Sequence, residues 1–286
     1  MTIALLLALD ETTRDLDRLL AFHRAAGVDA VVAAVVGASD AFESYEREGF
    51  VRRAAADASP TDLARVAVDE LGADWLIPGS LDELWWPRGE NLKDVLAVIP
   101  PRYGVVQALV RTFVDESMAE QGGGSAFVSR TVRTSLLGPD GSEGSPLHEL
   151  LRPVYRAGPN MTLDAADWTL GGRRVPLRAW YPIEVFRYPV DGGLWTREKV
   201  DSGLADGSLV VDERARGALA GEITSFPVPS IVDDSSYAVE CAAVGEVDLV
   251  RLDRQIRDLE VRISELEARF WPRVRRTLRR LARRPS

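Results

Sequence analysis

The sequence has little cysteine and histidine and no long apolar run. One cysteine, Cys241, excludes an internal disulfide, and two histidines, His23 and His148, leave no cysteine–histidine cluster of the kind that binds zinc. The apolar run Ile3–Leu9 has only seven residues and no basic stretch before it, so it predicts neither a signal peptide nor a membrane span of about 20 residues. We therefore expect a cytoplasmic protein, in which any metal would be a hard cation held by carboxylates.

The sequence also lacks the excess positive charge that is typical of nucleic-acid-binding proteins. It has 286 residues and a net charge of −9, so no nucleic-acid partner is expected. The charge is uneven, because seven arginines lie within the last fourteen residues and leave −16 for the rest of the chain. Hydrophobic residues make up 46%, which allows a chain of this length to bury a large core in one large domain or two small ones.

The first third of the chain alternates strand and helix patterns. Short apolar runs predict strands at 3–9, 28–36, 50–53 and 75–77. Helical spacing predicts helices at 13–26, 40–48 and 61–71. We therefore expect an α/β fold with a mainly parallel sheet and flanking helices. Because ligands bind at the carboxyl ends of parallel strands, the residues after Leu9, Val36 and Ile77 are candidates for a site.

The middle of the chain is less regular. Alternation predicts a strand at 103–113, and aromatic residues at 175–188 predict a strand followed by a connection. The glycine- and serine-rich stretch 119–146 predicts a long surface loop of the kind that acts as a lid or a binding loop. Residues 191–231 give no firm assignment.

The end of the chain carries a heptad pattern. Apolar residues follow a 3-4 spacing over three heptads, which predicts a coiled coil: Leu249, Leu252, Ile256, Leu259, Ile263, Leu266 and Phe270. The pattern continues among the arginines, which predicts a basic amphipathic helix. We expect two domains, at 1–232 and 246–286. The segment 249–284 would form a helix-mediated oligomer, contact the inner face of an anionic membrane peripherally, or pack on the acidic body.

Acidic residues follow three of the predicted strands. Asp10 and Glu11 come after the first strand, Asp40 after the second, and Asp82 and Glu83 after the strand at 75–77. Carboxylates gathered at one sheet edge can hold a divalent cation that bridges a diphosphate and neutralises a leaving group. Each position alone is better explained by a solvated loop acid or a helix N-cap. The convergence of all three favours a binding site.

Three stretches resemble glycosyltransferase family 2. Residues 73–103, ADWLIPGSLDELWWPRGENLKDVLAVIPPRY, resemble family members that carry DADEFWWP after ADW. The opening, with Asp10-Glu11, AFHRAAGVDAVV and SYEREGFV, is similar to the same family, as is VPLRAWYPIEVFRYP at 175–189. The resemblance covers roughly residues 1–190. It implies a GT-A-like fold, a nucleotide-sugar donor, a glycan or lipid-linked acceptor and, usually, Mn²⁺ or Mg²⁺.

The sequence departs from the family's pattern at three places, one of which is the Ser39-Asp40 turn, which lacks the usual Asp-Gly-Thr continuation. Ser80-Leu81-Asp82 stands where the family has Asp-x-Asp, and Ala165-Ala166-Asp167 stands where it has Asn-His-Asp. The loss of one carboxylate and one imidazole implies weak or absent metal binding, with Asp82 as the remaining metal ligand. The expected activity is therefore sugar transfer with weakened metal dependence. The alternative is a non-catalytic binding or scaffold protein that acts through its C-terminal helix.

The resemblance also implies a role for each site residue. Glu11 and Asp40 would hold the base and ribose of the donor, and a general base would take a proton from the acceptor hydroxyl. Arg178 would offset diphosphate charge, unless it forms a salt bridge on the sheet. The expected set is catalytic Glu83 and Asp167, donor-binding Asp10, Glu11, Asp40 and Arg178, and metal-binding Asp82.

Three further residues have two interpretations. Trp85 and Trp86 would form a stacking platform for a sugar or pack beneath the site. His23 lies on the inward face of a predicted helix, where core packing is favoured over catalysis.

Overall fold

The computed structural model describes residues 1–9, 16–35, 40–114, 131–135, 151–158, 163, 175–177, 181–188, 197–212, 214 and 226. All of them lie within Met1–Val244. The predicted C-terminal coiled coil and basic helix lie outside this part of the chain, so their prediction stands as made. In the described ranges, no helix is long and apolar enough to cross a membrane.

The N-terminal part alternates strands and helices as the sequence predicts. Its elements are β1 (Ile3–Leu9), α1 (Leu16–Ala25), β2 (Ala30–Val35), α2 (Asp40–Arg47), β3 (Val51–Ala54), α3 (Pro60–Asp69) and β4 (Trp75–Pro78). Helix α3 begins with a complete capping box between Ser59 and Asp62, which satisfies two backbone N–H groups of its first turn. Gly27, with φ +98°, gives the chain the left-handed turn between α1 and β2.

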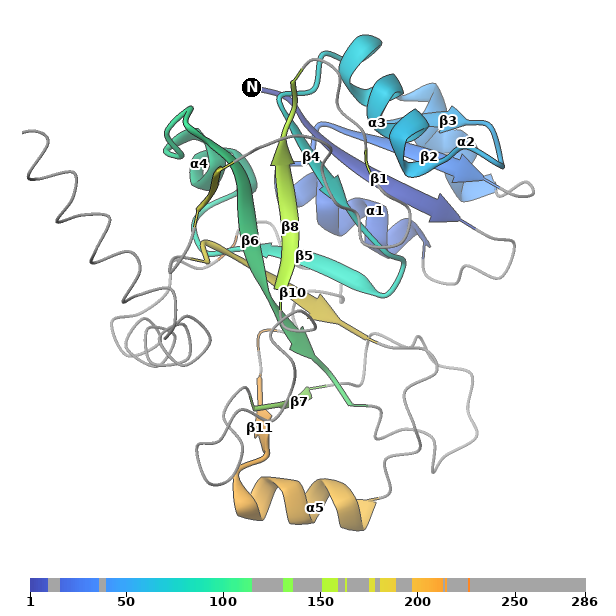
Figure 1. Ribbon diagram of the computed structural model, residues 1–286. Coiled ribbons are helices and arrows are strands. Elements are labelled where there is room, and N and C mark those ends of the chain that lie inside the picture. The colour runs from blue at the N-terminus through green and yellow to red at the C-terminus, as the bar shows by residue number, and fades with distance from the viewer. Residues whose placement is uncertain are drawn as a thin grey trace, which may run out of the picture. The chain divides into compact units, whose positions relative to one another are not determined.

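The main sheet combines a parallel part with an inserted antiparallel strand (Figure 1). Its order is β3-β2-β1-β4-β8-β6-β10-β5, with β9 also paired to β6. The added elements are β5 (Glu83–Pro87), α4 (Leu92–Ala97), β6 (Tyr103–Thr112), β8 (Leu151–Arg156), β9 (Val175–Leu177) and β10 (Ile183–Arg187). Strands β3, β2, β1 and β4 are parallel, and β10 is parallel to β6. Strand β8 is antiparallel to both β4 and β6, and β5 is antiparallel to β10.

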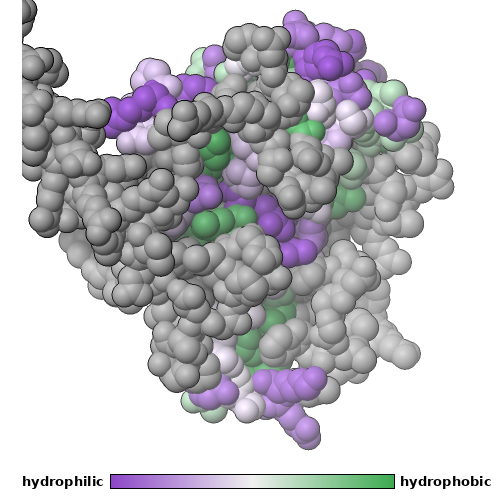
Figure 2. Space-filling view, viewed as in Figure 1, coloured by the Kyte–Doolittle hydropathy of each residue, from purple (hydrophilic) through white to green (hydrophobic). Residues whose placement is uncertain are grey.

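The core has one layer on each face of this sheet. Ile3, Leu5 and Leu7 of β1 pack with α1 and α4, whereas Ala4 and Leu6 pack with α3. The alternation follows from the period of two along a strand. Both faces of β1 are therefore covered, as its continuous apolar run predicts. The surface over α3 and over a later helix, α5 (Arg197–Asp206), is mainly hydrophilic (Figure 2).

A smaller sheet lies beyond the end of β6. Strands β7 (Val132–Thr134) and β11 (Leu209–Val211) are antiparallel, and α5 (Arg197–Asp206) packs against β11. Val114, Val132, Val200 and Leu209 form its own small core.

Two expectations for the middle of the chain need correction. The predicted surface loop at 119–146 contains strand β7, whose Val132 is buried against the small core. The connection expected after the strand at 175–177 is itself strand β10, because Ile183, Val185 and Phe186 are apolar enough to be buried inside the main sheet.

Candidate functional site

Three parallel strands end at one edge of the main sheet, where the acids were expected. Leu9 of β1 pairs with Val35 of β2, and Leu6 of β1 pairs with Pro78 of β4. The carboxyl ends of these strands therefore lie on the same side of the sheet. Asp40 opens α2 after the second of them. Of the expected donor-binding and catalytic residues, Asp10, Glu11, Asp167 and Arg178 lie outside the described residues, as does the side chain of Asp40.

A tight turn between β4 and β5 carries Asp82 and Glu83. The Gly79 amide donates to Leu6 O at 3.0 Å, and the Glu83 amide donates to Ser80 O at 3.2 Å. A Cβ on Gly79 would lie 2.6 Å from Leu5 Cδ1, so this position has no room for a side chain unless the core shifts. The Asp82 carbonyl accepts from the Tyr188 amide at 2.7 Å, which fixes the turn to the end of β10.

Arg152 holds Glu83 from the neighbouring strand. Because β8 is antiparallel to β4, it begins at the edge where β4 ends, and Arg152 is its second residue. Its Nε donates to Glu83 Oε1 at 3.0 Å. The Glu83 side chain is only 4% exposed. Burial raises the pKa of Glu83, and the charge and hydrogen bond of Arg152 act against that rise.

Arg187 holds Asp82 from the other side. Strand β10 is parallel to β6, and Arg187 is its last residue, paired in register with Glu83 of β5. Arg187 Nε lies 3.5 Å from Asp82 Oδ2, an ion pair without a hydrogen bond at Nε. We call Asp82, Glu83, Arg152 and Arg187 the edge cluster.

The sequence did not point to either arginine. Acids after a buried strand are a recognised pattern for cation binding, whereas an arginine at a strand end is usually a solvated residue. Arg152 also belongs to β8, a strand with two arginines and a proline in six residues, which the sequence did not predict. Only the topology brings it beside the turn between β4 and β5.

The described residues do not fit the divalent cation that the family resemblance implies. Both carboxylates of the motif are in ion pairs with guanidinium groups, and Glu83 is buried. Ser80, which stands at the place of the first acid, is exposed and offers a hydroxyl. Within the described ranges, no three Asp, Glu, His or Cys side chains gather in a group that could hold a metal ion.

A second charged group lies on the opposite face of β10. Glu184 is fully buried, accepts from Arg111 Nε at 2.7 Å and pairs also with Arg88 and Arg214. Burial alone would raise its pKa, but the charges of Arg111 and Arg214 outweigh that effect and lower it to about 2. Arg214 also donates a hydrogen bond to Asp212, and Asp212 accepts a second one from Arg133 of β7. These contacts join the small sheet to the main sheet.

Trp85, Trp86 and His23 belong to the core rather than to an open surface. Trp85 is 0% and Trp86 3% exposed, and Trp86 stacks on Phe186 with ring centres 5.0 Å apart. His23 Nδ1 donates to Leu19 O at 2.8 Å, so Nε2 is the acceptor for the Trp85 amide at 3.4 Å. Burial lowers the pKa of His23 to about 4. Packing is thus the observed role of all three side chains.

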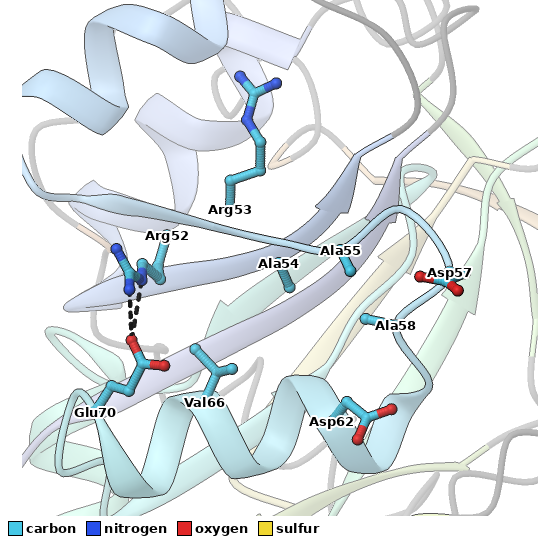
Figure 3. Close-up of a pocket in the computed structure, with 9 residues that line it drawn as sticks. All are labelled: Arg52, Arg53, Ala54, Ala55, Asp57, Ala58, Asp62, Val66 and Glu70. Carbon is cyan, nitrogen blue, oxygen red and sulfur yellow. Dashed lines mark hydrogen bonds and ion pairs between the residues drawn. The ribbon is translucent and has the colours of Figure 1, made fainter.

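A cavity of about 410 Å³ lies between β3 and α3, away from the edge cluster (Figure 3). Arg52 extends along it to Glu70, and Asp62 at its other end is engaged in the capping box with Ser59. Arg52 and Glu70 thus satisfy each other, and Asp62 is held by Ser59. The sequence did not predict this cavity, and it offers no arrangement that points to a ligand.

Comparison with known proteins finds only distant similarity. No family model and no curated protein sequence matches the chain. Among solved structures, S. aureus TarS is 15% identical over 55% of this chain and 28% of its own, with a TM-score of 0.31. CMP:2-keto-3-deoxy-manno-octonic acid synthetase complexed with CTP is 15% identical over 55% of this chain and 74% of its own, with a TM-score of 0.29.

A third similar structure is glucosyl-3-phosphoglycerate synthase from Mycobacterium tuberculosis in complex with phosphoglyceric acid. It is 12% identical over 54% of this chain and 56% of its own, with a TM-score of 0.29. The matched part spans about a quarter of TarS and about half of the synthase. At these TM-scores the similarities carry no argument about what this chain does.

Proposed function

We propose that the chain is a glycosyltransferase that moves a sugar from a nucleotide-sugar donor to a glycan or lipid-linked acceptor, with weakened metal dependence. The observation that supports this proposal is the common edge of β1, β2 and β4, where the edge cluster places two arginines beside the acids of the turn. Ligands of open parallel sheets bind at this edge.

The proposed step needs few protein groups. The oxygen of the acceptor hydroxyl forms a bond to the anomeric carbon of the donor sugar. The bond from that carbon to the diphosphate oxygen breaks, and its electron pair stays on the leaving nucleoside diphosphate. A general base takes the proton of the acceptor hydroxyl. Glu83 and Asp167 are the residues predicted for this role. Glu83 is buried and paired with Arg152, so of the two we propose Asp167 as the base.

Binding and turnover together test the proposal. UDP, GDP and their sugars are titrated against the full chain with and without Mn²⁺, and release of free sugar or its transfer is then measured. We expect at least one nucleotide to bind and its sugar to be released or transferred. Asp82→Ala is expected to weaken binding, because Asp82 either binds the metal or holds Arg187. If no nucleotide binds at millimolar concentration, the proposal is wrong.

A second candidate is a non-catalytic protein that binds a nucleotide or a glycan. The observation in its favour is that Asp82 and Glu83 are both engaged by arginines, so neither is presented as a free carboxylate. Tight nucleotide binding without hydrolysis or transfer would favour this candidate over the first.

The C-terminal segment adds a proposal about location. We propose that the chain is cytoplasmic and that its arginines at 273–284 contact the inner face of a membrane, at about 1 kcal/mol for each basic residue near an anionic surface. Flotation with anionic liposomes is expected for the full chain and not for the chain without residues 272–286. Equal flotation of both would contradict the membrane contact.

A further inference from the structure

The net charge of the edge cluster equals that of a two-carboxylate site with a divalent cation bound. Two carboxylates and two guanidiniums sum to zero, the same local charge as two carboxylates that hold one divalent cation. The two ion pairs are near each other, because Asp82 and Glu83 are consecutive residues and Arg187 is paired in register with Glu83. Arginine keeps its charge at every physiological pH, so this balance does not depend on a bound ion.

The topology of the sheet brings all four residues to the ligand-binding edge. Asp82 and Glu83 follow the carboxyl end of β4, and Arg187 ends β10. Arg152 lies at the start of β8, an antiparallel strand that begins where its neighbours end. The two arginines therefore approach the turn from different strands, on either side of it.

Each arginine contacts its carboxylate through Nε, the inner nitrogen of the guanidinium group. Arg152 donates through Nε to Glu83, and Arg187 is nearest to Asp82 through Nε. Within the described part of the chain, neither makes a recorded hydrogen bond through Nη1 or Nη2. The Arg152 side chain is 30% exposed and that of Arg187 is 38% exposed. Their outer N–H groups thus remain available to an anion, in the planar fork that suits phosphate oxygens.

We propose that Arg152 and Arg187 form a metal-independent clamp for the diphosphate of a nucleoside diphosphate, with Glu83 and Asp82 as the positioning residues that hold them. This inference rests on the proposed function. When the bond to the sugar breaks, the diphosphate gains one negative charge, and the two guanidiniums stabilise it in the place where the family resemblance implies a cation.

The test measures nucleotide binding in excess EDTA. Calorimetric titration of the full chain with UDP and GDP gives the dissociation constant with EDTA and with Mn²⁺. We expect the two values to agree within about threefold. Arg187→Ala is expected to weaken binding in EDTA by about 10- to 100-fold, the range for one or two charge-assisted hydrogen bonds.

Arg152 needs a milder substitution, because removing it would leave Glu83 buried and unpaired. Arg152→Lys keeps the positive charge beside Glu83 but loses the fork, so we expect binding to weaken about tenfold while thermal unfolding changes little. Arg24→Ala is the matched control. Arg24 forms an ion pair with Glu48 near the end of α1, at the opposite edge of the sheet, and its loss should leave binding unchanged.

The outcomes separate this proposal from the proposed function. Binding that requires Mn²⁺ and disappears in EDTA would overturn the clamp and leave the glycosyltransferase proposal standing. Metal-independent binding that Arg187→Ala and Arg152→Lys leave unchanged would overturn the clamp as well. The absence of binding under both conditions would overturn the proposed function and the clamp together.

Discussion

Substitution of His23 should remove a defined part of the pH dependence of stability. His23 is fully buried between α1 and β5, and its pKa in the folded chain is about 4 instead of the ordinary 6.5, chiefly because of burial. Below pH 6.5 the unfolded chain takes up a proton that the folded chain refuses, so the free energy of unfolding falls as the pH falls from 6.5 to about 4. At 1.36 kcal/mol for each pH unit, the free energy of unfolding falls by about 3 kcal/mol over this interval.

The assay is urea unfolding at pH 7 and at pH 4, for the wild type and for His23→Gln. Other groups also titrate between these values, so the difference between the two proteins isolates His23. We expect the wild type to lose about 3 kcal/mol more than the variant on going from pH 7 to pH 4. Equal pH dependence in the wild type and His23→Gln would refute the reasoning.

Three further predictions concern stability and are tested by urea unfolding. Glu184→Gln should lower the free energy of unfolding by about 3–5 kcal/mol, because Arg111 and Arg214 would lose the charge of their buried partner; a loss below about 1 kcal/mol would contradict this role. Gly79→Ala should cost about 1–3 kcal/mol, since its Cβ would press on buried Leu5, and an unchanged stability would show that the core yields freely. Ser59→Ala should cost about 1 kcal/mol by removing the cap of α3, whereas Ser59→Asp, which keeps an acceptor, should cost less.

The sequence predicted the N-terminal part well because its signals are local. The predicted strand at 3–9 has the same bounds as β1, and the predicted helix at 61–71 overlaps α3. Continuous apolar runs mark strands that are buried on both faces, and helical spacing places Leu63 and Ala67 on the inward side of α3, where both are buried. These patterns depend on a few neighbouring residues and need no knowledge of the rest of the chain.

The strands around the site were harder to predict because their signals are not local. Strand β8, LRPVYR, has neither an apolar run nor a clean alternation. Its place between β4 and β6 follows from pairing with residues of β4 that lie 79 and 81 positions away along the chain. Strand β5 begins at Glu83 and holds both tryptophans, whereas the sequence predicted only that the acids follow the strand at 75–77. The acids of the turn could be found from the sequence, but their arginine partners could not, because only the folded sheet makes them neighbours.

The insertion of β8 has a consequence for how the chain is made. In the described part of the chain β8 lies between β4 and β6, so a nascent chain that ends before residue 151 has the strands β3-β2-β1-β4 with an unpaired edge at β4, and β6 lacks its partners β8 and β10. Such edges pair readily with other chains, and contacts distant in sequence form slowly. A chain truncated before β8 therefore exposes the unpaired edge of β4, and we expect it to aggregate more readily than the full chain.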